Sequence, residues 1–175
     1  MNKKYCHIPK TGGVSICKLI GRLPGHAIES ETKNKYIYTF VRNPYDRLIS
    51  TFFYLKNGGR NNGDKKDRDK YIGNSSFEDF VKTKLINASK NQIHFRPQKY
   101  WIPNGASFIG KFENLENDFN EVKKIVGIKG NLQHLNKTSH KDYREYYNDE
   151  LANIVYKVYE EDFEEFGYDK NSYKK

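Results

Sequence analysis

Short apolar runs alternate with stretches of helical period along this chain, and the alternation predicts an α/β fold. The first extended run covers residues 4–8. Pro9 disfavours helix at the residue before it, so a strand should end there. Apolar side chains at Ile16, Leu19 and Ile20 then follow the spacing of one helical face. These features predict a strand, a glycine turn and a helix.

A second strand-and-helix pair follows a polar loop. Residues 36–41 are β-branched and aromatic, which favours a strand. Asn43 and Pro44 suit the N-cap and the first position of a helix. The apolar positions that follow share one helical face: Tyr45, Leu48, Ile49, Phe52 and Phe53.

The rest of the chain continues the alternation with weaker signals. In chain order these signals predict a helix capped by Ser76, a strand over 106–113, a helix over 114–126 and a last helix over 142–165. The fold prediction is therefore a single α/β domain over residues 1–175, with a short, mainly parallel sheet flanked by helices.

Composition refines this picture. A chain of 175 residues fits one domain, and fourteen Tyr and eleven Phe indicate an aromatic-rich core. The net charge of +9 suits a polyanionic ligand such as a nucleotide, an acidic glycan or nucleic acid, but a lysine-rich soluble surface explains it equally well. Residues 57–74 are polar and glycine-rich, which predicts a mobile loop, and residues 169–175 are expected to fray.

The cysteines and the hydropathy pattern bear on the cellular compartment. Cys6 and Cys17 lack metal-ligand spacing, so we expect two buried free thiols; a disulfide would require the two side chains to face each other. No apolar run reaches membrane-spanning length, and no hydrophobic signal segment is evident at the N-terminus. The sequence predicts a soluble, cytoplasmic protein that does not contact membranes.

The glycine turn is the strongest candidate for chemistry. Gly12 and Gly13 let the backbone approach a ligand closely, and the N–H groups of the first helical turn point at such a ligand. Lys10 adds a positive charge, while Thr11 and Ser15 add hydroxyl donors, which favours phosphate or sulfate. Because the lysine precedes the glycines, the turn is not the nucleoside-triphosphatase loop, and no aspartate-ended strand that would hold magnesium is evident. A metal-free anion site is the prediction.

Two ordered motifs resemble those of sulfotransferases that use 3′-phosphoadenosine 5′-phosphosulfate (PAPS). The first is His-Ile-Pro-Lys-Thr-Gly-Gly at 7–13, and the second is Phe-Val-Arg-Asn-Pro-Tyr-Asp-Arg-Leu-Ile-Ser at 40–50. Residues 109–113 match the family pattern Ile-Gly-Lys/Arg-x-Glu. Within the family, the chain is most similar to the carbohydrate branch, which contains heparan sulfate 2-O- and 6-O-sulfotransferases and chondroitin sulfotransferases. The resemblance implies a P-loop-like fold and transfer of a sulfuryl group to an acceptor hydroxyl, leaving 3′-phosphoadenosine 5′-phosphate (PAP).

The resemblance also implies which residues hold the donor. Arg42 and Ser50 correspond to the arginine and serine that hold the 3′-phosphate, and a guanidinium suits phosphate oxygens. The alternatives are a structural ion pair for Arg42 and an exposed helical position for Ser50. The full set expected at the donor is Lys10, Thr11, Gly12, Gly13, Val14, Ser15, Arg42, Ser50, Lys137, Thr138 and Ser139.

A histidine base between the two motifs is a further implication, and His26 occupies that interval. An imidazole can accept the proton of a sugar hydroxyl as its oxygen attacks sulfur; the alternative is a turn histidine in water. Residues 94–102 resemble a His-aromatic-Arg-Pro block of carbohydrate sulfotransferases. Its members that suit a sugar or phenol site are His94, Arg96, Gln98 and Trp101. His94 is the second candidate for the base, and the alternative for the block is a structural role with Trp101 in the core.

Three alternatives to a carbohydrate sulfotransferase are compatible with the sequence. The acceptor could be a small phenol instead of a carbohydrate. A phosphotransferase that uses ATP would depend on magnesium, and the missing Walker spacing opposes it. A non-enzymatic reading is a basic module that binds nucleotides or nucleic acid. The resemblance favours a PAPS-dependent enzyme that needs neither metal nor nucleic acid.

Overall fold

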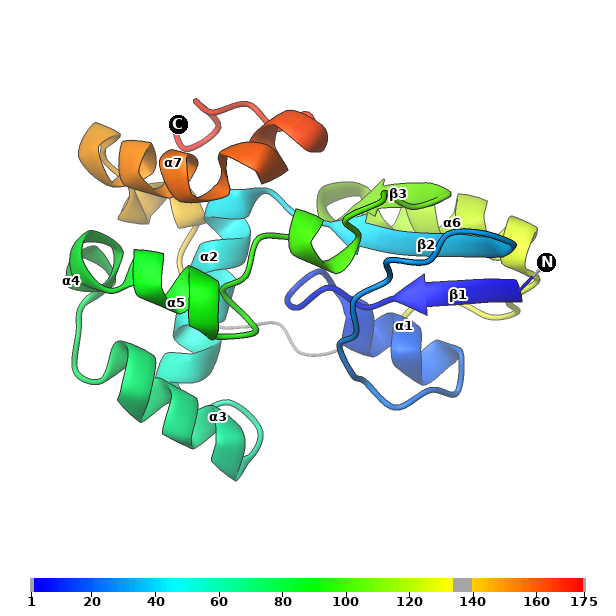
Figure 1. Cartoon of the computed structure of the whole chain (residues 1–175), viewed down its shortest axis with the longest axis horizontal. Coiled ribbons are helices and arrows are strands. Elements are labelled where there is room, and N and C mark those ends of the chain that lie inside the picture. Colours follow the sequence, from blue (N-terminus) through cyan, green and yellow to red (C-terminus); the bar gives the residue numbers. More distant parts are fainter. Residues whose placement is uncertain (1, 134–139, 175) are drawn as a thin grey trace. The chain divides into compact units, whose positions relative to one another are not determined.

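The structure is a computed structural model that describes residues 2–133 and 140–174. Its elements form two compact units. The first comprises residues 2–42 and 98–133 and contains the β-sheet, whereas the second comprises residues 43–97 and 140–174 and is helical (Figure 1). The expectation that 1–175 behaves as one domain stays a prediction.

The first unit combines parallel strands with two helices and short 3-10 turns. In chain order its described elements are β1 (Asn2–Cys6), α1 (Gly13–Leu19), β2 (Lys35–Val41), η2 (Lys99–Trp101), β3 (Phe108–Lys111), η3 (Phe112–Asn114) and α6 (Leu115–Val126). The second unit consists of helices, one π turn and one 3-10 turn. These are α2 (Pro44–Lys56), α3 (Asn62–Asp67), η1 (Arg68–Ile72), α4 (Phe77–Thr83), α5 (Leu85–Asn91), η4 (Tyr143–Tyr146) and α7 (Asp149–Glu165).

The sheet has the order β1-β2-β3, and both strand pairs are parallel. Cys6 lies opposite Thr39, and Val41 lies opposite Lys111, so the carboxyl ends of all three strands meet at one edge. The predicted α/β fold with a short parallel sheet is confirmed. β1 ends two residues before the predicted boundary, and His7 instead begins the turn that leads to α1.

The two faces of the sheet are covered differently. Tyr5, Tyr38 and Phe40 share one face, where they pack in one cluster with side chains of α1 and α6. On the other face, the Cys6 thiol lies 3.7 Å from two carbonyl oxygens. One belongs to Ala27, between α1 and β2, and the other to Trp101, the last residue of the 3-10 turn η2. The predicted aromatic core is confirmed.

The second unit is built around α2. Asn43 caps α2 as predicted, because its side chain accepts a hydrogen bond from Tyr45 N at 3.0 Å, and Pro44 is the first helical residue. Aromatic and aliphatic side chains of α2, α4, α5 and α7 form a second core. Ser76 and Asp79 form a capping box at the start of α4, which confirms the helix predicted there.

Two assignments in the second unit need correction. Residues 57–74, predicted as a loop, contain α3 and the π turn η1. The buried carboxylate of Asp64 organises this segment by accepting hydrogen bonds from the Tyr54 hydroxyl at 2.7 Å and from Arg60 N at 2.8 Å. The last helix begins at Asp149 instead of residue 142, because Asn148 has extended backbone and caps it.

The end of the chain is also ordered by specific contacts. Residues 169–175 were expected to fray, but contacts hold the described part of this segment, residues 169–174. The hydroxyl of Tyr45 donates to Lys170 O at 2.8 Å, and Asn43 Nδ2 donates to Ser172 Oγ at 2.8 Å. The Tyr143 hydroxyl donates to Ser172 O at 2.8 Å. Local sequence patterns do not predict these contacts, because the partners lie far apart in the sequence.

Candidate functional site

The turn after β1 is closed by its own hydrogen bonds. Thr11 is fully buried, and its hydroxyl donates to Ile8 O at 2.9 Å. Lys10 has a φ of 68°, a left-handed conformation that side-chain-bearing residues rarely adopt. Thr11 was predicted to donate a hydrogen bond to a ligand, but its hydroxyl instead donates within the turn, to Ile8 O. The turn therefore has a specific backbone shape that presents Lys10.

The two glycines allow close packing around the turn. Gly12 has a φ of 82°, and a Cβ there would lie 2.8 Å from Leu115 Cδ2. A Cβ on Gly13 would lie 1.9 Å from His7 Cδ2, so the imidazole of His7 occupies the space that a side chain would need. The predicted glycines are thus required by the protein's own packing, whatever ligand the turn takes.

The start of α1 suits an anion. No side chain caps the helix, and its first turn, which includes Val14 and the buried Ser15, carries no acidic residue. Ser15 N donates to Gly12 O at 3.1 Å, which continues the turn into the helix. Negative charge on a ligand would therefore meet Lys10 and backbone N–H groups without a competing carboxylate from this turn.

Arg42 lies at the same edge of the sheet, directly after β2. Its Nη1 lies 3.3 Å from Lys10 O, and its guanidinium carbon lies 4.1 Å from the centre of the Phe112 ring. Parallel strands bring their carboxyl ends together, so two segments separated by about thirty residues meet here. The structure therefore brings the Lys10 turn and Arg42 together, as the sequence predicted.

Gln98 is engaged with Arg42. Its Oε1 accepts a hydrogen bond from Arg42 N at 2.8 Å, and its Nε2 donates to Arg42 O at 2.9 Å. The side chain is fully buried. Gln98 was predicted at the acceptor, and a contact with an acceptor stays untested; its observed partner is the backbone of Arg42.

His26 is oriented by a backbone carbonyl. Its Nδ1 lies 2.8 Å from His7 O, and a carbonyl oxygen can only accept. Nδ1 therefore carries a proton, and in the neutral ring Nε2 carries the lone pair. The ring centre lies 4.4 Å from that of His7 and 5.7 Å from that of Trp101. Trp101 is 3% exposed, and its buried indole N–H has no hydrogen-bond partner among the described residues.

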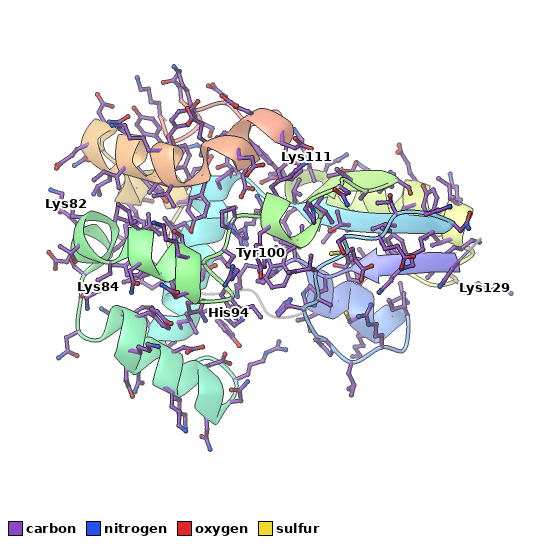
Figure 2. The ribbon with its side chains drawn as sticks, viewed as in Figure 1. Lys82, Lys84, His94, Tyr100, Lys111 and Lys129 are labelled. Atoms are coloured by element: carbon purple, nitrogen blue, oxygen red, sulfur yellow. The ribbon has the colours of Figure 1, made fainter. Side chains whose placement is uncertain are left out.

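His94 and Arg96 lie in the second unit, on the segment after α5 where Figure 2 labels His94. The buried Arg47 donates to the carbonyl oxygens of His94, at 3.1 Å, and Arg96, at 2.8 Å. This contact fixes the backbone of the predicted block from α2. Arg47 thus has a structural role that the sequence did not reveal.

Gln92 determines the proton position on His94. Its Oε1 accepts hydrogen bonds from the backbone N–H groups of His94 and Phe95, at 2.6 and 3.2 Å, which identifies the other amide atom as nitrogen. That Nε2 lies 3.0 Å from His94 Nδ1 and donates to it. In the neutral ring the proton of His94 is therefore on Nε2, the opposite arrangement to His26.

Ser50 is buried on α2 of the second unit, and its role toward a nucleotide stays a prediction. Lys137, Thr138 and Ser139 lie outside the described residues.

The sequence did not single out Phe112 or Lys111 for the site. Lys111 ends β3 opposite Val41, and Figure 2 labels it there. The available signal was their place in the 109–113 pattern.

Neither cysteine is a candidate nucleophile. Both are buried and free, as predicted. Burial, together with the nearby Glu29 carboxylate, raises the pKa of the Cys6 thiol to about 12. Burial also raises the pKa of Cys17. At neutral pH both groups are thiols and not the reactive thiolates, so covalent chemistry at sulfur is not supported.

No group of three or more His, Cys, Asp or Glu side chains among residues 2–133 and 140–174 is arranged to hold a metal ion. In the same part of the chain, every helix is too short or too polar to cross a membrane.

Comparisons with known proteins agree with the motifs. Residues 4–169 match the Sulfotransferase family. An uncharacterized protein from Archaeoglobus fulgidus is 28% identical over 109 residues, which cover 62% of this chain and 82% of that protein. No solved structure matches the chain.

Proposed function

Because the chain belongs to the sulfotransferase family, we propose that it transfers a sulfuryl group from PAPS to an acceptor hydroxyl, with a carbohydrate as the acceptor class. The contact between Arg42 and the Lys10 turn carries this proposal, since Nη1 of Arg42 lies 3.3 Å from Lys10 O. Two cationic side chains at one edge of a parallel sheet suit a donor that carries a phosphate at each end. The carbohydrate class rests on the motif resemblance.

In this proposal, different residues bind the two phosphate-bearing ends of the donor. Lys10 and the N–H groups of Gly12, Gly13 and Val14 would hold the 5′-phosphosulfate, because the N–H of Ser15 is engaged with Gly12 O. Arg42 would hold the 3′-phosphate, with Ser50 as its expected partner in that task. A guanidinium supplies paired N–H donors to phosphate oxygens, and stacking on Phe112 restricts its orientation. When bound, PAPS supplies the sulfuryl group and leaves as PAP.

His26 is the proposed base. In its neutral form Nε2 carries the lone pair, because Nδ1–H donates to His7 O. Nε2 would take the proton of the acceptor hydroxyl as that oxygen forms a bond to sulfur. The bond between sulfur and the phosphate oxygen breaks, and its electron pair stays on the phosphate oxygen. Lys10 would stabilise the charge that develops there.

His94 is less suited to the same role. Gln92 Nε2 donates to His94 Nδ1, so the neutral ring presents an N–H and not a lone pair at Nε2. A histidine with this tautomer can donate a hydrogen bond from Nε2 to an oxygen of the acceptor substrate. The two hydrogen-bond patterns therefore support His26 over His94 as the base. The role proposed for His94 at the acceptor rests on the motif resemblance.

An acceptor screen tests the proposal. The wild-type protein is incubated with PAPS and either glycans or small phenols, and PAP formation is followed. We expect PAP release that depends on a glycan. Release with phenols alone would move the acceptor to that class. PAPS binding without turnover on any acceptor would favour a binding module, and absence of both binding and turnover would overturn the assignment.

A further inference from the structure

We propose that Gln98 is a positioning residue that directs Arg42 toward the 3′-phosphate, and that it thereby sets the preference for a 3′-phosphorylated donor. This inference rests on the proposed function. Gln98 itself would not touch the donor, because its amide is engaged with the backbone of Arg42 and its side chain is fully buried.

The amide of Gln98 acts as a substitute for a strand neighbour. β2 ends at Val41, and its pairing with β3 ends at the Val41–Lys111 pair. Backbone groups beyond that point need other partners inside a folded protein. Gln98 supplies an acceptor for Arg42 N at 2.8 Å and a donor for Arg42 O at 2.9 Å. Both bonds together fix the peptide planes on the two sides of the Arg42 Cα.

Gln98 is itself held in place by the turn that it starts. Trp101 N donates to Gln98 O at 3.0 Å, which closes the 3-10 turn η2. Trp101 is buried, and its carbonyl oxygen accepts from Glu29 N at 2.8 Å. The buried amide therefore projects from an anchored backbone, which is what a positioning residue requires.

The far end of Arg42 depends on where its backbone lies. The guanidinium stacks 4.1 Å from the centre of the Phe112 ring and lies 3.3 Å from Lys10 O. The Phe112 ring also lies against the Lys10 turn, since a Cβ on Gly12 would be 3.3 Å from Phe112 Cδ2. An arginine has many rotamers, so anchoring its backbone is necessary to keep the guanidinium between these two contacts.

The test compares two ligands that differ in the 3′-phosphate. Affinities for PAP and for adenosine 5′-monophosphate (AMP) are measured by calorimetry on the wild type and on Gln98→Met, which keeps the length of the side chain and removes both hydrogen bonds. We expect the PAP affinity to fall about tenfold, which corresponds to about 1.4 kcal/mol, because the Arg42 guanidinium is no longer directed toward the 3′-phosphate. The AMP affinity should stay within about twofold. Thr39→Val is the matched control, because it removes a buried hydrogen bond to Cys6 O in the same sheet.

A double-mutant cycle separates positioning from general damage. In an Arg42→Ala background, Gln98→Met should cause no further loss of PAP affinity. Equal loss of PAP and AMP affinity, an unchanged PAP-to-AMP ratio, or full additivity with Arg42→Ala would overturn the inference. If Gln98→Met does not fold, Gln98→Glu, which keeps the acceptor for Arg42 N, is judged by the same criteria. A wild type that does not bind PAP would instead overturn the proposed function, and the inference with it.

Discussion

At the scale of single residues, the two candidate histidines differ in which nitrogen holds the proton. His26 donates from Nδ1 to a backbone carbonyl, whereas His94 accepts at Nδ1 from Gln92. The carbonyl and the amide are fixed in direction by the fold, so each neutral ring has one available tautomer. In the neutral state, Nε2 of His26 can therefore accept a proton, whereas Nε2 of His94 can donate a hydrogen bond.

Removing each histidine should therefore have a different kinetic result. For His26→Asn we expect kcat to fall by about 10²- to 10⁴-fold, the usual contribution of a general base, with PAP affinity unchanged. For His94→Asn we expect a higher KM for the acceptor and a smaller effect on kcat. Steady-state kinetics with a glycan acceptor measures both. Loss of kcat in His94→Asn alone would assign the base to His94.

Gly13 illustrates a residue whose identity is set by packing. A Cβ there would lie 1.9 Å from the ring of His7, whereas a Cβ on Gly25 would meet nothing within 4 Å. Gly13→Ala should lower the free energy of unfolding by about 1–3 kcal/mol through overpacking. Gly25→Ala, the matched control, should change it little. Urea unfolding of both variants checks this, and equal values would show that His7 moves aside without cost.

At the scale of elements, the buried carboxylate of Asp64 joins α3 to Tyr54 of α2. Burial by itself raises the pKa of Asp64, but hydrogen bonds from Arg60 N and the Tyr54 hydroxyl outweigh it and hold the pKa below its usual value. A carboxyl group with a lowered folded-state pKa stabilises the fold above its unfolded pKa of about 3.9. That stabilisation is lost as the pH falls through the lower, folded-state pKa.

Acid titration of stability tests this arrangement. The free energy of unfolding of the wild type should decrease as the pH falls below about 4. In Asp64→Asn this part of the decrease should be smaller, and stability at pH 7 should be lower by about 1–3 kcal/mol because a buried network is left incomplete. Urea unfolding at a series of pH values measures both quantities. An unchanged acid slope in the variant would contradict the role given to Asp64.

At the scale of the whole molecule, the net charge of +9 should influence the binding of anions. PAP that binds only the folded protein raises its stability by mass action, by about 2.7 kcal/mol at a hundredfold excess over Kd. Thermal unfolding should therefore shift to higher temperature with PAP, and the shift should shrink as salt screens the charges. Arg42→Ala should show a much smaller shift. A shift that is equal in the variant would place the nucleotide away from Arg42.

The sequence by itself determined the strand, turn and helix around Lys10 and the start of α2 at Pro44. It also indicated that Arg42 would meet the turn. These features follow from local chemistry: glycine conformations, an Asn-Pro helix start and the common edge of parallel strands.

Only the tertiary structure decided the role of Gln98, the tautomers of the two histidines, the order in residues 62–72 and the anchoring of the chain's end. Each depends on a partner that the local sequence pattern does not specify: Arg42 for Gln98, His7 for His26, Tyr54 for Asp64 and Tyr45 for Lys170. A polar side chain has several possible partners, and the fold selects among them by bringing one within hydrogen-bonding distance.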